Sequence, residues 1–205
     1  MNFTRKTLRY VISQIKGKSV LDIGSAGQGN VRGREGWIFG ILRKHAKSIK
    51  GLDICECNDK DITLGSAETF SFKEKFDVIT VFDVIEHFDN VGVALENMKK
   101  HLNVGGKVIM TTPNMTSIGP VLDVILFRGI RSNKTHTLGY NARMLHYMLY
   151  KHGFKDIKVK FDAYPLAGNH TGLKRILSLA RCLVTFPITF MWKEFSPTLY
   201  VSARV

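Results

Sequence analysis

Cysteine is scarce in this chain, which has only three cysteines in 205 residues. Cys55 and Cys57 are separated by one residue, which is too close for a zinc knuckle or a redox pair, and Cys182 lies far along the chain. We therefore expect no disulfide framework and reduced cysteines in a cytoplasmic protein. No metal is expected either, because Cys55, Cys57 and His45 are poorly spaced to bind one ion together.

Acidic residues are also few, with 17 Asp and Glu against 30 Lys and Arg, so the formal net charge is +13. This excess predicts an anionic partner, such as a phosphorylated or nucleotide-linked substrate, an acidic membrane surface or a nucleic acid. Nucleic acid is disfavoured, because the cations are spread along the chain and no RNA-binding signature is present. The first ten residues also lack the long apolar core of a signal peptide.

The most informative stretch is SVLDIGSAGQG, from Ser19 to Gly29. Its apolar residues predict a short buried strand, and Gly24, Gly27 and Gly29 crowd the residues that follow. Glycine allows a sharp turn and a close approach to a ligand, because no Cβ is in the way. A helix after this turn presents free N–H groups to polar or anionic ligand atoms. Strand, glycine turn and helix in this order are typical of the entry to a nucleotide-binding crevice.

The spacing of these glycines indicates the kind of nucleotide. A dinucleotide fingerprint requires G-x-G-x-x-G after the strand, but Ala26 stands in the place of the second glycine. Asp22, two residues before Gly24, instead makes the stretch resemble motif I of the class I S-adenosylmethionine-dependent methyltransferases, (V/I)-L-D-(I/L/V)-G-x-G-x-G. The stretch departs from this motif at Ala26 and by one additional residue before Gly29. The alternative is a nicotinamide- or nucleotide-sugar-dependent Rossmann enzyme, which predicts glycine at position 26.

Two further stretches match the same family. The predicted strand 48–53 ends in Asp53, and an acid in this place can accept hydrogen bonds from a ribose diol. Residues 65–68, GSAE, resemble the family's G-D-A-E, with Ser66 in place of the acid that meets the adenine amine. Ser66 is also suited to cap a helix that begins there, and the two roles are compatible.

The region of the fourth strand has the most specific resemblance. Residues 76–87 read F-D-V-I-x-x-x-x-V-I-E-H, which closely resembles the methyltransferase group that includes the ubiquinone-pathway O-methyltransferases. The resemblance implies that Glu86 and His87 follow the carboxyl end of the strand, where open α/β sheets bind ligands. It assigns the binding of S-adenosyl-L-methionine to residues at the ends of three strands and in the GSAE turn: Asp22, Gly24, Ser25, Ala26, Gly27, Asp53, Ile54, Ser66, Ala67, Glu68, Phe82, Asp83 and Val84.

The resemblance extends from Val20 to Phe161 and implies a Rossmann-like α/β fold in a single domain, residues 1–205. The expected sheet is seven-stranded and mostly parallel, with an antiparallel last strand and helices on both faces. We place strands at 19–23, 48–53, 61–64, 76–82, 107–112, 157–161 and 198–203, and helices at 3–15, 35–45, 90–102, 116–130 and 142–152. Residues 115–140 and 168–197 are expected to be insertions or covers on the substrate side.

Methyl transfer to a hydroxyl often requires removal of one proton, and histidine titrates near neutrality. His136 and His87 are therefore the candidate bases, and His136 is preferred because it lies in the substrate-side segment. Each of them is equally suited to a purely structural role. A sugar hydroxyl on a glycan or its lipid-linked precursor is the first hypothesis for the acceptor. A quinone-like or other metabolite hydroxyl is the second, and a cofactor-binding module without catalysis is a further alternative.

Residues 172–192 have a basic amphipathic pattern that is followed by aromatic residues. Such a segment can lie in a membrane interface, although it is too short and too interrupted to span a bilayer. A peripheral membrane contact through 172–192 is therefore one hypothesis. A substrate lid or a homodimer contact is the other.

Overall fold

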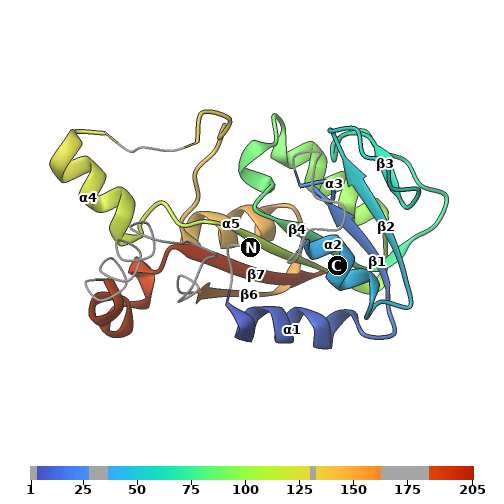
Figure 1. Ribbon diagram of the computed structural model, residues 1–205, viewed down its shortest axis with the longest axis horizontal. Coiled ribbons are helices and arrows are strands. Elements are labelled where there is room, and N and C mark those ends of the chain that lie inside the picture. The colour runs from blue at the N-terminus through green and yellow to red at the C-terminus, as the bar shows by residue number, and fades with distance from the viewer. Residues whose placement is uncertain (1–3, 28–36, 130–132, 163–184) are drawn as a thin grey trace.

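A computed structural model describes residues 4–27, 37–129, 133–162 and 185–205. Within them, seven strands form one sheet in the order β3-β2-β1-β4-β5-β7-β6 (Figure 1). The strands are β1 (Ser19–Ile23), β2 (Ser48–Asp53), β3 (Ile62–Leu64), β4 (Phe76–Phe82), β5 (Leu102–Pro113), β6 (Lys155–Asp162) and β7 (Thr198–Arg204). β7 runs antiparallel to β5 and β6 on either side of it, and all the other strand pairs are parallel, which confirms the expected fold class.

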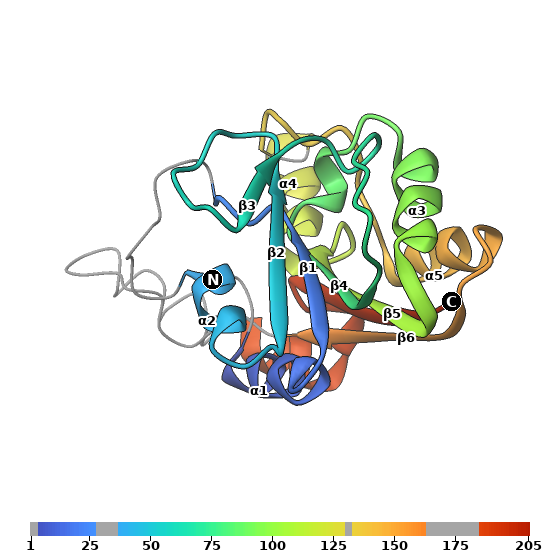
Figure 2. The same ribbon diagram turned by 90° about the vertical axis from the view of Figure 1, so that its right-hand side faces the viewer.

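Helices cover both faces of this sheet. The α-helices are α1 (Arg5–Ile15), α2 (Ile38–Arg43), α3 (Val91–Lys100), α4 (Ile118–Phe127) and α5 (Ala142–Lys151), and the short 3-10 helices are η1 (Ile85–His87) and η2 (Lys193–Phe195). Residues 185–191 are also helical. Helices α1 and α2 lie on one face, and α3 and α5 lie on the other (Figure 2).

Each face has its own apolar core, because successive side chains on a strand point to opposite sides of the sheet. The core under α3 and α5 includes the buried residues Leu21, Ile79, Val108, Leu95 and Leu145. The core under α1 and α2 includes the adjacent residues of the same three strands, which point to the other face: Val20, Val78 and Ile109. Val11 of α1 and Leu42 of α2 pack against them. The central strands β1, β4 and β5 are therefore buried on both faces, which holds their carboxyl ends rigidly in one row.

The start of β5 differs from the prediction, which began this strand at residue 107. Leu102 already pairs with Phe76, and the register then shifts before Lys107 pairs with Val78. Gly105 has a positive φ of 73° and accommodates this irregularity. Gly105 and Gly106, which precede the predicted start of the strand, therefore lie within a bulged strand. The other elements agree with their predicted ranges to within about three residues at each end.

The two regions predicted as substrate-side covers are described in part. Helix α4 follows β5 and projects away from the sheet, and the helical residues 185–191 project from the same end of the molecule (Figure 1). The predictions for residues 28–36 and 168–184 lie outside the described residues. Among the helices that are described, none combines the length and the apolar character needed to cross a membrane.

Candidate active site

The glycine turn after β1 is held tightly between two neighbouring strands. Gly24 has a φ of 84°, and a Cβ at this position would overlap the side chain of Val84, which follows β4. The Gly24 N–H donates to the carbonyl oxygen of Leu52 on β2 at 2.8 Å. Only glycine fits both the backbone conformation and the available space, so the turn brings the ends of β1, β2 and β4 together.

The polar side chains of this turn are buried and hold it in place. The Ser25 hydroxyl donates to the carbonyl oxygens of Asp22 and Leu52, at 3.1 and 3.2 Å. The Thr80 hydroxyl donates to Asp22 Oδ1 at 2.6 Å. Burial raises the pKa of Asp22 to about 7, and the negative charge of Asp53 adds to this effect. The side chains of Asp22 and Ser25 thus lie beneath the turn.

Asp53 at the end of β2 is oriented by backbone donors on both sides. Its Oδ2 accepts a hydrogen bond from the Ala26 N–H at 2.7 Å, and its Oδ1 accepts one from the Cys55 N–H at 2.8 Å. A carboxylate has about four acceptor positions, so two remain for the hydroxyls of a ribose. The adjacent Ile54 is 75% exposed and offers an apolar surface next to that carboxylate.

A helix that Ser66 could cap was expected at the GSAE stretch, but residues 67–69 form a turn, and the described residues between β3 and β4 contain no helix. Ser66 Oγ accepts a hydrogen bond from the Glu68 N–H at 3.2 Å. Glu68 Oε1 in turn accepts one from the N–H of Asn90, which caps α3, at 2.9 Å. Ala67 is buried against the core under α3. Ser66 therefore stabilises a turn instead of capping a helix, and its contact with an adenine stays a prediction.

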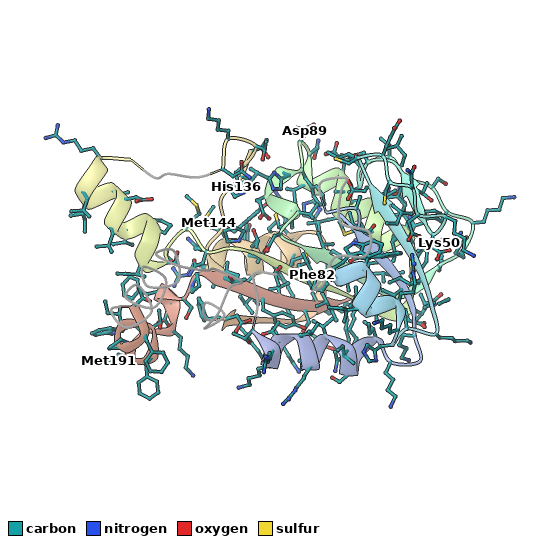
Figure 3. All side chains as sticks on the ribbon, viewed as in Figure 1. Lys50, Phe82, Asp89, His136, Met144 and Met191 are labelled. Carbon is teal, nitrogen blue, oxygen red and sulfur yellow. The ribbon has the colours of Figure 1, made fainter. Side chains whose placement is uncertain are left out.

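The end of β4 has an unusual backbone conformation. Asp83 has a φ of 54°, in the left-handed region that residues other than glycine seldom adopt. Two hydrogen bonds with Thr111 of β5 hold it there: the Asp83 N–H donates to the Thr111 carbonyl, and the Thr111 hydroxyl donates to Asp83 Oδ1. Strained residues of this kind cluster at functional sites. Phe82, directly before it, is half-buried near the middle of the sheet (Figure 3).

Glu86 in η1 is a buried carboxyl that also anchors the substrate-side loop. Its Oε2 accepts a hydrogen bond from the Thr112 hydroxyl at 3.0 Å, and burial raises its pKa to about 7. Its backbone carbonyl accepts the N–H groups of Thr137 and Leu138, at 3.0 and 3.2 Å. These bonds draw the loop that contains His136 onto the end of β4.

The two candidate bases meet as a result of this docking. The rings of His87 and His136 are 4.8 Å apart, edge to face. His87 Nδ1 is 2.9 Å from the carbonyl oxygen of Thr135, 48 residues away in sequence. Because a carbonyl only accepts, Nδ1 carries the proton, and Nε2 retains its lone pair in the neutral ring. Burial, with a contribution from the charge of His87, holds the pKa of His136 below its usual value.

Two features of this cluster are missing from the sequence analysis. The ligand atoms of Glu86, His87 and His136 lie within 4.8 Å of one another, a grouping that could hold a metal ion. The sequence analysis considered Cys55, Cys57 and His45 as metal ligands. Within the described residues, they form no such group. Tyr140 is the second feature: its hydroxyl is buried without a hydrogen-bond partner, and burial together with Glu86 raises its pKa to about 12.

The fold and the site together define a class: a Rossmann-like domain in which β1, β2 and β4 end side by side, at the edge where open α/β sheets bind nucleoside-containing cofactors. A family model described as a methyltransferase domain matches residues 3–159. The chain therefore belongs to this family of methyltransferases. The glycine turn, the oriented Asp53 carboxylate and the exposed Ile54 are compatible with the S-adenosyl-L-methionine that the motif at residues 19–29 predicts.

Known relatives agree with this assignment. The chain is 27% identical over 129 residues to the ubiquinone biosynthesis O-methyltransferase of Coxiella burnetii, a match that covers 52% of this chain and 49% of the relative. The chain thus spans about half the length of the curated relatives it matches.

Solved structures show the same fold. A SAM-dependent methyltransferase from Archaeoglobus fulgidus superimposes with a TM-score of 0.67 at 20% identity, over 98% of this chain and 92% of that one. The N-methyltransferase NodS from Bradyrhizobium japonicum, in complex with S-adenosyl-L-homocysteine, gives a TM-score of 0.54 at 15% identity, over 97% and 83%.

Proposed function

We propose that this protein transfers the methyl group of S-adenosyl-L-methionine to a hydroxyl oxygen of its acceptor, with His136 as the base. The supporting observation is the histidine pair at the end of β4: His87 lies in η1, and His136 lies on the loop that the Glu86 carbonyl holds in place. The bound cofactor supplies a methyl group on a positively charged sulfur. The residues of the chain must then hold the acceptor oxygen in line with that methyl group and accept its proton.

The surroundings of His136 suit it to this role. Its lowered pKa leaves the imidazole neutral at pH 7, which is the form that accepts a proton. In the proposed step, the acceptor oxygen forms a bond to the methyl carbon, the carbon–sulfur bond breaks, and His136 takes the hydroxyl proton. His87 is the alternative base, because the Thr135 carbonyl orients its ring. The unpartnered Tyr140 hydroxyl is a potential hydrogen-bonding group for the acceptor.

For the acceptor, we propose a sugar hydroxyl on a glycan or on its lipid-linked precursor. The net charge of +13 supports an acceptor that carries phosphate or another anionic group. The alternative is a quinone-like or other small hydroxyl, which the relative named as a ubiquinone biosynthesis O-methyltransferase favours. A module that binds the cofactor without catalysis is a third possibility, because Ala26 and Ser66 depart from the family's motifs.

Two measurements, made one after the other, test the proposal. Isothermal titration with S-adenosyl-L-homocysteine should show binding. Binding of NAD without binding of S-adenosyl-L-homocysteine would refute the assignment of the cofactor. A transfer assay with methyl-labelled cofactor then compares glycan, lipid-linked and quinone-like acceptors. Turnover of none of them, despite cofactor binding, would favour the non-catalytic module.

The role of His136 is tested on whichever acceptor is turned over. His136→Ala should lower turnover about 10²–10⁴-fold and leave the affinity for S-adenosyl-L-homocysteine unchanged. The matched control is His146→Ala, which removes an exposed imidazole from α5. A comparable loss in His87→Ala but not in His136→Ala would move the base to His87. Full activity in both variants would leave the acceptor oxygen to react without a protein base.

A further inference from the structure

Helix α4 exposes an unusual number of apolar side chains for its length. Leu122, Val124, Ile125 and Leu126 are all exposed, and Ile125 reaches 69%. Contiguous exposed apolar residues on a soluble domain mark a surface that contacts another molecule or a membrane.

The helical residues 185–191 and Trp192 expose a second apolar set. Phe186, Phe190, Met191 and Trp192 are exposed, and the rings of Phe186 and Phe190 stack with their centres 6.1 Å apart. Phenylalanine and tryptophan are typical of helices that lie in the interface of a bilayer, where the ring is buried between the headgroups and the acyl chains.

These two apolar projections lie at the same end of the molecule in Figure 1, and Figure 3 shows Met191 at that end. Their bases are joined. The buried Asn114, which precedes α4, donates from Nδ2 to the carbonyl oxygens of Glu194 and Ser196, at 2.7 and 2.8 Å. The N–H of Met115 donates to the Tyr140 carbonyl at 2.8 Å, which ties the same base to the edge of the active site.

The charge near α4 indicates which surface this end contacts. Of the described residues between 116 and 135, Arg128 and Lys134 are cations and Asp123 is the acid. Arg128 is exposed at the C-terminus of α4. Apolar side chains beside an excess of cations match an anionic lipid surface, in which the apolar groups enter the interface and the cations meet the headgroups.

We propose that α4 and residues 185–192 together dock the protein on an anionic membrane, with the active-site loop next to the docking surface. This inference depends on the exposed residues of the two projections, and it holds whichever hydroxyl accepts the methyl group. It extends the contact expected at 172–192 to α4, which the sequence analysis assigned only to a substrate-side cover. A lipid-linked acceptor would then meet His136 directly at the membrane.

The test is sedimentation of the full chain with vesicles of phosphatidylglycerol and phosphatidylcholine, or of phosphatidylcholine alone. The protein should sediment with the anionic vesicles, and salt should weaken binding because it screens the cations. The double variants Ile125→Ser/Leu126→Ser and Phe190→Ser/Trp192→Ser should each lower the partition coefficient at least about tenfold. Val104→Ser is the matched control, because Val104 is an exposed apolar residue near the opposite end of β5 and should leave binding unchanged.

Binding of S-adenosyl-L-homocysteine is measured in parallel and should be unaltered in every variant, because none of these residues belongs to the cofactor site. Wild-type protein that stays in the supernatant at low salt would refute the docking surface. Equal binding to both kinds of vesicle would refute the anionic specificity. A loss confined to the Phe190/Trp192 variant would refute the role of α4. The proposal would also be overturned if the wild-type protein binds no vesicles but forms a dimer, and if the double variants are monomeric. In that case a second copy of the chain would occupy this surface.

Discussion

The buried carboxyl of Glu86 makes the stability of this protein depend on pH in a way that one substitution can isolate. Glu86 is 2% exposed, and its pKa rises from 4.5 to about 7 because burial disfavours the charged form. The folded protein retains this proton up to about pH 7, whereas the unfolded chain releases it near pH 4.5. The folded state therefore loses stability as the pH rises through this window.

The size of the effect follows from the two pKa values. Between pH 5 and pH 8, ionisation of Glu86 should cost the folded state about 2.5 kcal/mol. Glu86→Gln keeps the shape and an acceptor for the Thr112 hydroxyl but cannot ionise. The free energy of unfolding of the variant, minus that of the wild type, should thus be larger at pH 8 than at pH 5 by that amount.

Urea unfolding of both proteins at the two pH values, with EDTA present, measures this difference. Asp22, whose pKa also rises to about 7, is present in both proteins, so its contribution cancels. Glu56→Gln, at an exposed position, controls for the loss of a carboxylate at the surface. A difference between Glu86→Gln and wild type that is the same at both pH values would refute the burial and desolvation of Glu86 on which the site description depends.

Three further predictions concern the cofactor and the metal. Asp53→Ala should weaken binding of S-adenosyl-L-homocysteine by about 1.5–3 kcal/mol by isothermal titration, the range for hydrogen bonds to a charged group; unchanged affinity in a folded variant would contradict the ribose contact. Gly24→Ala should lower the free energy of unfolding by at least about 1–2 kcal/mol, because of the positive φ and the overlap with Val84. Val84→Ala in the same chain should recover part of that loss, and no recovery would rule out the overlap. Dialysis against EDTA should leave turnover unchanged if His136 is a proton acceptor, whereas a loss restored by Mg²⁺ or Zn²⁺ would assign Glu86, His87 and His136 to a metal site.

Much of this protein could be predicted from the sequence, because the signals concerned are local. The apolar run of β1, the glycine turn and the acid at the end of β2 lie in short stretches whose residue types dictate their conformation. The parallel order of the sheet then follows from strands that alternate with helices. Asp53 could be placed beside the glycine turn for this reason, since the carboxyl ends of neighbouring parallel strands meet at one edge.

Other features depend on contacts between residues that are far apart in sequence, and only the tertiary structure decided them. His87 and His136 meet because the backbone carbonyl of Glu86 accepts two N–H groups from a loop about fifty residues later, and no spacing rule encodes that bond. The burial that raises the pKa of Glu86 is likewise a property of the packed site. The sequence of α4 is strongly apolar, but whether its side chains face a core or solvent depends on what packs against them. Hydrophobicity alone carries no information about that neighbour.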